Sequence, residues 1–270
     1  MAIGARELSG ALPVYQTLFF RSAIGLGVTF ALIVLMRKTQ LLHTSRLKIH
    51  AFRNVFHFAG QYGWFLGIGL LPLAEVFALE FTVPVWTLLF AAIALKETIT
   101  ARKLVSVLLG ALGVLVIVQP GYAIVDSASL IVLAAAACYA IAHTTTKLLS
   151  ANENTITILF FMCLIQLPIG FALSISEWTW PQQEQWLWLV LVGITALSAH
   201  YCMVKAMHSA EVTTVVTIDF LRLPLIALVG VFFYAEPFKL SLMLGGLLML
   251  FGNLIATRTR SMTPIESIQR

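Results

Sequence analysis

Two apolar segments of this chain repeat one another about half a chain apart. Residues Thr17–Leu32 and Ile158–Leu173 are identical at eight of sixteen positions without a gap. The similarity continues downstream, where Glu80 aligns with Asp219 in nearly the same register. Because both copies are apolar enough to cross a membrane, the repeat indicates duplicated membrane helices, the usual construction of a secondary transporter.

The composition supports a membrane location. Hydrophobic residues make up 60% of the chain and charged residues 11%, and the mean hydropathy is +0.93. A soluble domain has about 25% charged residues, so a single water-soluble core is excluded. At about 20 residues per crossing, the sequence predicts an all-α polytopic membrane protein with nine spans: Pro13–Met36, Ala51–Leu71, Glu75–Leu95, Leu104–Val118, Leu130–Leu149, Thr155–Ile175, Trp186–Met207, Val212–Tyr234 and Leu240–Ala256.

The basic residues orient these spans. Thirteen of the seventeen Lys and Arg residues flank the loops and tail of one side, whereas only Arg6 and Lys239 fall on the other. The positive-inside rule makes the basic side and the C-terminal tail cytoplasmic. This distribution explains the net charge of +5 better than nucleic-acid binding does. The two repeated helices are the first and sixth spans, and an odd separation predicts an inverted repeat.

The first half is shorter than the second. The second half has a complete helix before its repeated segment, whereas the first has only Met1–Leu12 there. We expect repeats at residues 1–120 and 127–257, followed by a tail at 258–270. The ancestral protein would contain a five-helix unit twice, and this chain would lack most of the first helix. A protein with nine helices by origin is the alternative.

Several stretches resemble the drug/metabolite transporter superfamily, specifically its ten-helix EamA-type members. They are Leu12-Pro13-Val14-Tyr15-Gln16 before Phe19-Phe20-Arg21, Pro84 with the apolar run to Lys96-Glu97, Gly110-Ala111-Leu112-Gly113-Val114, and Ala210-Glu211-Val212-Thr213. The run Asp219-Phe220-Leu221-Arg222-Leu223-Pro224 is similar to the branch with riboflavin and S-adenosylmethionine carriers. The resemblance covers nearly the whole chain and implies a carrier of small metabolites.

Charged residues inside a span are expensive and are therefore functional candidates. Asp219 and Arg222 lie three residues apart, so we expect them to pair, either as a mid-membrane polar centre or as a packing device. Glu80 has no basic neighbour in the sequence, and its isolation suggests proton coupling; a hydrogen bond to Gln61 or to a neighbouring helix is the alternative. Arg21 has three open interpretations: a partner for Glu80, a contact to an anionic substrate, or a side chain that snorkels to the interface.

Two aromatic and polar groups also correspond across the repeat. They lie in the second span and the seventh span, and such a mixture suits a planar organic solute. Packing in the core or at the interface is the alternative for any single member. With the charged residues, the predicted substrate-binding set is Arg21, His57, Gln61, Tyr62, Trp64, Glu80, His200, Tyr201, Asp219 and Arg222.

The sequence favours a secondary active transporter for a small organic metabolite in the bacterial inner membrane. No metal site, cofactor or nucleic-acid partner is expected, the lipid bilayer is the expected surrounding, and a homodimer stays open. A membrane-embedded enzyme is disfavoured because HExxH, GxSxG and phosphate-binding glycine loops are missing from the sequence. A non-transporting membrane assembly subunit remains the alternative, supported by the short first half.

Overall fold

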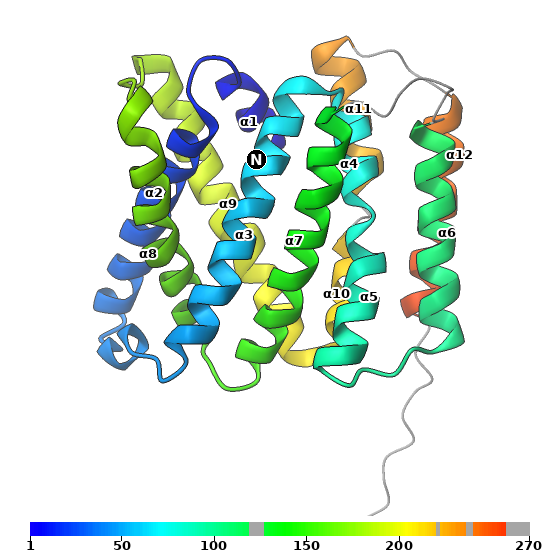
Figure 1. The fold of residues 1–270 in the computed structure, drawn as a ribbon, viewed down its shortest axis with the longest axis horizontal. Helices are drawn as coiled ribbons and strands as arrows, with labels where there is room; N and C mark the ends of the chain where they lie inside the picture. Colours follow the sequence, from blue (N-terminus) through cyan, green and yellow to red (C-terminus); the bar gives the residue numbers. More distant parts are fainter. Residues whose placement is uncertain (119–126, 220–221, 236–239, 258–270) are drawn as a thin grey trace, which may run out of the picture.

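The computed structural model describes residues 1–118, 127–219, 222–235 and 240–257, and these residues form a bundle of helices (Figure 1). The predicted tail at 258–270 and Glu236 therefore lie outside the described residues. The helices are α1 (Ala2–Leu8), α2 (Val14–Leu35), α3 (Leu47–Leu70), α4 (Leu73–Glu80), α5 (Val83–Ala94), α6 (Ala101–Val118), α7 (Ser127–Ser150), α8 (Thr155–Ser174), α9 (Gln183–Ser209), α10 (Val212–Asp219), α11 (Arg222–Tyr234) and α12 (Leu240–Thr257), with two 3-10 turns at Thr39–Leu42 and Ile175–Glu177.

Each predicted span coincides with one long helix or with two half-helices. Five segments are long and apolar enough to cross a membrane by length and composition: Val14–Leu35, Glu75–Ala94, Ser127–Ser150, Thr155–Glu177 and Gln183–Ser209. The polytopic all-α class is therefore confirmed, and the count of nine spans stays a prediction. The short stretch at the start forms α1, which packs against α9 and α3.

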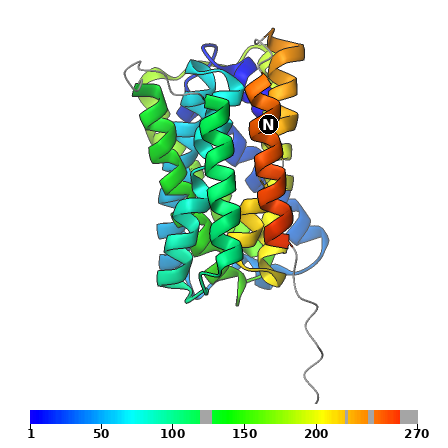
Figure 2. The same ribbon diagram turned by 90° about the vertical axis from the view of Figure 1, so that its right-hand side faces the viewer.

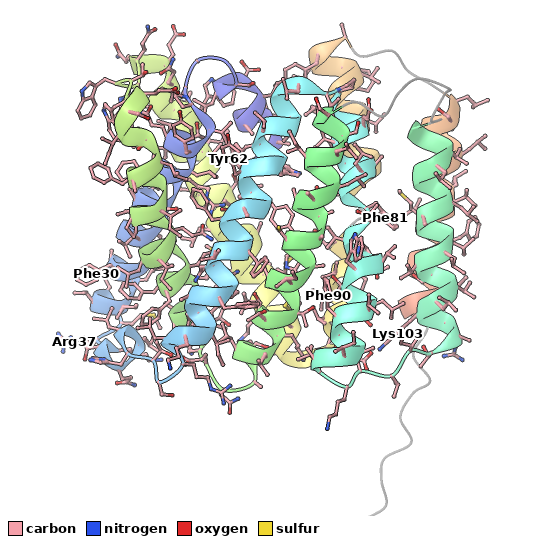
Figure 3. The ribbon with its side chains drawn as sticks, viewed as in Figure 1. Phe30, Arg37, Tyr62, Phe81, Phe90 and Lys103 are labelled. Atoms are coloured by element: carbon pink, nitrogen blue, oxygen red, sulfur yellow. The ribbon has the colours of Figure 1, made fainter. Side chains whose placement is uncertain are left out.

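One predicted span is interrupted near mid-height. The third divides into α4 and α5 at Phe81 and Thr82, and Pro84 lies in the first turn of α5, where proline is well tolerated. The eighth contributes α10 and α11, and residues 220–221 between them lie outside the described residues. In Figure 1, α4 lies above α5 whereas α10 lies below α11, so the two spans run in opposite directions. Phe81, labelled in Figure 3, marks the level of the break between α4 and α5.

The boundaries of the helices recur between the halves at the offset that aligns Glu80 with Asp219. At this offset the start of α4 matches that of α10, and the end of α3 matches that of α9. Lys96 and Ala235 match as well, and both have left-handed backbones, with φ of 57° and 51°. The duplication thus extends to backbone details that hydropathy does not determine.

Packing concentrates on three helix pairs, α2 with α8, α3 with α7, and α6 with α12. The last pair stands side by side in both ribbon views (Figures 1 and 2). Many apolar side chains point outward, such as Phe30 and Phe232, whereas polar side chains such as Gln16, Asn54 and Gln166 are buried. This inverted distribution fits a bundle whose outer face meets lipid. The basic residues Arg37 and Lys103 lie at its lower end (Figure 3).

Candidate functional site

Two carboxylates and one guanidinium meet beside the interruption between α4 and α5. Arg222 donates from Nη2 to Glu80 Oε1 at 2.7 Å. The Nη1 atom of Arg222 lies 3.3 Å from Asp219 Oδ2. The predicted pair of Asp219 and Arg222 is therefore confirmed.

The predicted isolation of Glu80 is wrong. Besides the bond from Arg222, Oε2 of Glu80 accepts a hydrogen bond of 2.8 Å from Trp64 Nε1. The guanidinium of Arg222 also lies over the ring of Phe77, 5.3 Å from its centroid. The expected alternative, a hydrogen bond to Gln61 or to a neighbouring helix, is confirmed in its second form, since Trp64 lies on α3. Because Glu80 has a cationic partner, the argument for proton coupling from an unpaired carboxylate no longer applies.

Glu80 occupies an unfavourable position in its own helix. It is the last residue of α4, and the C-terminal end of a helix carries a partial negative charge that disfavours a carboxylate. Glu80 therefore depends on Arg222 rather than on its own helix. A local rule broken at a helix interruption is typical of a functional site.

A second polar cluster lies between α2, α3, α8 and α9 and centres on His57. Its Nδ1 atom accepts a hydrogen bond of 2.8 Å from Gln166 Nε2, and its Nε2 atom lies 3.4 Å from Gln61 Nε2. The ring of His200 packs against it edge to face, with centroids 4.7 Å apart. The structure therefore brings together His57, Gln61 and His200, as the repeat predicts.

Arg21 joins this second cluster rather than Glu80. Its Nη2 atom donates to Gln166 Oε1 at 3.0 Å, and only 3% of the residue is exposed. A side chain this buried does not reach the interface, so the snorkelling interpretation is wrong. Its contact to an anionic substrate group stays a prediction.

Sequence reasoning missed four members of the two clusters. Arg53 is buried with Asn54, although the loop-flank interpretation placed it at the cytoplasmic surface. Gln166 joins Arg21, Asn54 and His57. The ring of Tyr139 packs edge to face against that of His57, with centroids 5.8 Å apart. The available signal was Gln166 itself, a polar residue inside the strongly apolar repeated segment.

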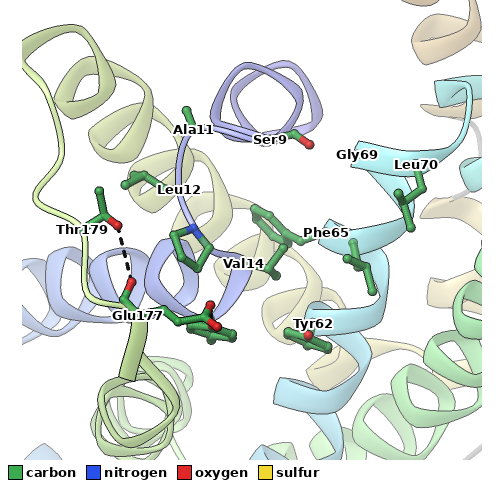
Figure 4. A pocket seen from close by; sticks show the side chains of 14 residues that line it. Ser9, Ala11, Leu12, Val14, Tyr62, Phe65, Gly69, Leu70, Glu177 and Thr179 are labelled. Carbon is green, nitrogen blue, oxygen red and sulfur yellow. Dashed lines mark hydrogen bonds between the residues drawn. The ribbon is translucent and has the colours of Figure 1, made fainter. Parts of the chain in front are cut away.

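The two predicted tyrosines lie outside both clusters. Tyr62 lines a groove of about 610 Å³ at the upper end of the bundle, bordered by Ser9–Tyr15, α3, Glu177 and Thr179 (Figure 4). Its ring stacks on Tyr15, with centroids 6.4 Å apart and an 8° interplanar angle. Tyr201 is 41% exposed and is not brought to either cluster.

The first cluster is accessible to solvent-sized molecules. The side chain of Arg222 is 34% exposed and that of Asp219 is 30% exposed, although many protein groups surround Arg222. In the second cluster His200 is half-buried, and so is His143 on α7. These partly exposed groups can form hydrogen bonds and ion pairs with a polar solute. Among the described residues, no group of three His, Cys, Asp or Glu side chains is suited to hold a metal ion.

This arrangement of helices is found in a known family. The pattern of the EamA-like transporter family matches residues 1–119 and 126–258. The chain belongs to the EamA-like transporter family. A solved crystal structure has the same fold, with a TM-score of 0.77 at 21% identity, covering 94% of this chain and 90% of the other.

Curated relatives within this EamA-like group are named as transporters. A riboflavin transporter of Brucella anthropi is 29% identical over 93% of this chain and 90% of its own. A pseudopaline exporter of Pseudomonas aeruginosa is 26% identical over 94% and 90%. An S-adenosylmethionine uptake transporter of Rickettsia bellii is 22% identical over 86% and 79%. The assignment to the drug/metabolite transporter superfamily, and to the suggested branch, is confirmed.

Proposed function

We propose that this protein is a secondary active transporter that moves a small organic metabolite across the bacterial inner membrane. Its two halves, residues 1–120 and 127–257, form an inverted repeat, and they expose the site to one side of the membrane at a time. The C-terminal tail is cytoplasmic. The substrate contacts both polar clusters, and the charged centre of Glu80, Asp219 and Arg222 changes partners during transport.

The observation that carries this proposal is the charged centre beside the helix break between α4 and α5. Ion pairs at this depth are costly to bury, and transporters place substrate sites at discontinuous helices near the bilayer midplane. Arg222 contacts Glu80 from the other half of the chain and Asp219 from its own half. A solute that competes for Arg222 or Asp219 would therefore act on contacts between the halves.

Two further observations support the inverted repeat and its orientation. The span formed by α4 and α5 and the span formed by α10 and α11 run in opposite directions, as an inverted repeat requires (Figure 1). The labelled basic residues Arg37 and Lys103 lie at one end of the bundle (Figure 3), which the positive-inside rule would make cytoplasmic.

Transport by the purified chain in proteoliposomes tests the proposal, with labelled riboflavin and labelled S-adenosylmethionine as the first probes. Asp219→Asn and Arg222→Gln should each lower uptake or efflux at least tenfold, because each removes a charge from the centre. Lys48→Gln, which removes an exposed charge from the first turn of α3, should leave the rate unchanged. Equal rates in all variants would overturn the assignment of the site.

A further inference from the structure

Two buried arginines are linked by two amide side chains in the second cluster. Arg21 donates to Gln166 Oε1 at 3.0 Å, and Gln166 Nε2 lies 3.4 Å from Asn54 Oδ1. The same Asn54 oxygen accepts a hydrogen bond of 2.7 Å from Arg53 Nη1, while Arg53 Nε donates to Thr146 Oγ1 at 2.9 Å. The acceptors that surround these two guanidiniums are thus neutral amides and a hydroxyl.

The cluster carries two positive charges without a compensating acid. Arg21 is 3% exposed and Arg53 is 2% exposed. Among the described residues, neither guanidinium has a carboxylate within 4.0 Å, since the ion pairs found there involve other side chains. In addition, Nε and Nη1 of Arg21 have no hydrogen-bond partner.

Such an arrangement is strongly unfavourable unless something neutralises it. Burying an unpaired charge costs several kcal/mol even after relaxation. Arginine does not escape this cost by losing its proton, because its guanidinium stays charged in proteins. Water could satisfy the free N–H groups of Arg21 but would not supply the missing negative charge.

We propose that Arg21 and Arg53 form a subsite for the carboxylate, or a similar oxyanion, of an organic substrate. This inference rests on the proposed function and specifies the substrate class. In the substrate-free state, Gln166 Oε1 takes the place of the substrate oxygen on Arg21. A carboxylate supplies two charged acceptors in the geometry that a guanidinium binds best, so it displaces the single amide oxygen.

The position of Gln166 in its helix suits such an exchange. Pro168 lies inside α8 and has no backbone N–H, so the carbonyl of Leu164 lacks its usual helical donor. Gln166 lies between these two residues, in the turn that has lost this hydrogen bond. Helices bend most readily at such positions. Local bending of α8 would release Gln166 from Arg21 and open the closed cluster to a solute.

Anion-dependent thermal stability of the full chain in detergent tests the subsite. The probe is sodium acetate compared with sodium chloride at equal ionic strength, and the melting temperature is read from tryptophan fluorescence. We expect acetate to raise the melting temperature by about 2–4 °C, the shift for a ligand in excess of its dissociation constant. Because acetate can stabilise proteins non-specifically, the deciding quantity is the difference between wild type and variants.

Two variants and one control sharpen the test. Arg21→Gln should lose the acetate-specific shift. Gln166→Glu places a carboxylate inside the protein, so it should raise the melting temperature in chloride and abolish the response to acetate. Gln40→Glu makes the same change at an exposed position and should respond like wild type.

The outcomes separate this inference from the proposed function. An acetate response equal in wild type and Arg21→Gln, or absent from wild type, overturns the subsite even if the protein transports the flavin probe. A response shown by wild type and Gln40→Glu but lost in Arg21→Gln and Gln166→Glu, without transport of any solute, supports the subsite and rejects the transporter.

Discussion

Arg222 on α11 donates a 2.7 Å hydrogen bond to Glu80, the last residue of α4. The two residues come from different halves of the chain. Their contact joins the halves at the level of the proposed site.

The pairing of Glu80 with Arg222 predicts a large coupling between these positions. Arg222→Gln leaves a buried carboxylate without a cation, and we expect a loss of about 1–3 kcal/mol, below the usual cost for fully buried pairs because Arg222 is partly exposed. The double variant with Glu80→Gln should recover part of this loss. Melting temperatures of the two single variants and the double variant measure the coupling. The pair Lys103–Glu211, whose carboxylate is exposed, is the control and should couple by less than about 1 kcal/mol.

The indole of Trp64 should contribute to the same centre. Trp64→Phe keeps most of the apolar volume but removes the N–H that Glu80 accepts at 2.8 Å. A hydrogen bond to a charged acceptor contributes about 1.5–3 kcal/mol, so the melting temperature should fall measurably. Trp180→Phe changes a strongly exposed indole and should have little effect. Equal shifts in the two variants would contradict this role of Trp64.

Glu97 should hold the start of α10 at the lower end of the bundle. Its carboxylate accepts hydrogen bonds of 2.9 Å from the backbone N–H of Val212 and from Thr213 Oγ1. Glu97→Gln removes the charge at this helix start, and we expect a loss of about 0.5–2 kcal/mol. Thermal unfolding measures it. Glu184→Gln removes a charge from the first turn of α9, where a capping box already satisfies the backbone, and a comparable loss there would refute the specific role of Glu97.

Two glycines should respond in opposite ways to the same substitution. A Cβ on Gly113 would lie 2.6 Å from the carbonyl oxygen of Gly245, and backbone yields little, so Gly113→Ala should cost about 1–3 kcal/mol. Gly27 lies in the interior of α2 with nothing within 4 Å of its Cβ position. Gly27→Ala should therefore stabilise the helix by up to about 1 kcal/mol. Melting temperatures that fall equally in both variants would show that packing at Gly113 is not the cause.

Much of this fold follows from hydropathy and repetition. Long apolar runs predict the helices, and three-residue spacing predicts the pair Asp219–Arg222. The pairing of Glu80 with Arg222 was not predictable, because the repeat aligns Glu80 with Asp219 but does not say which helices touch. The roles of Arg53 and Asn54 were also missed, since a basic residue near a helix start is usually assigned to the adjacent loop. Only tertiary packing places them beside Gln166.

Gly113 on α6 faces the backbone of α12 so closely that a Cβ on it would lie 2.6 Å from the carbonyl oxygen of Gly245. These two helices carry none of the proposed substrate-binding residues. This contact is therefore separate from the groups that would select a solute, whereas the contact of Glu80 with Arg222 is not. Substitutions on α3 or α9 can thus change the preferred solute while the pairing of α6 with α12 stays intact.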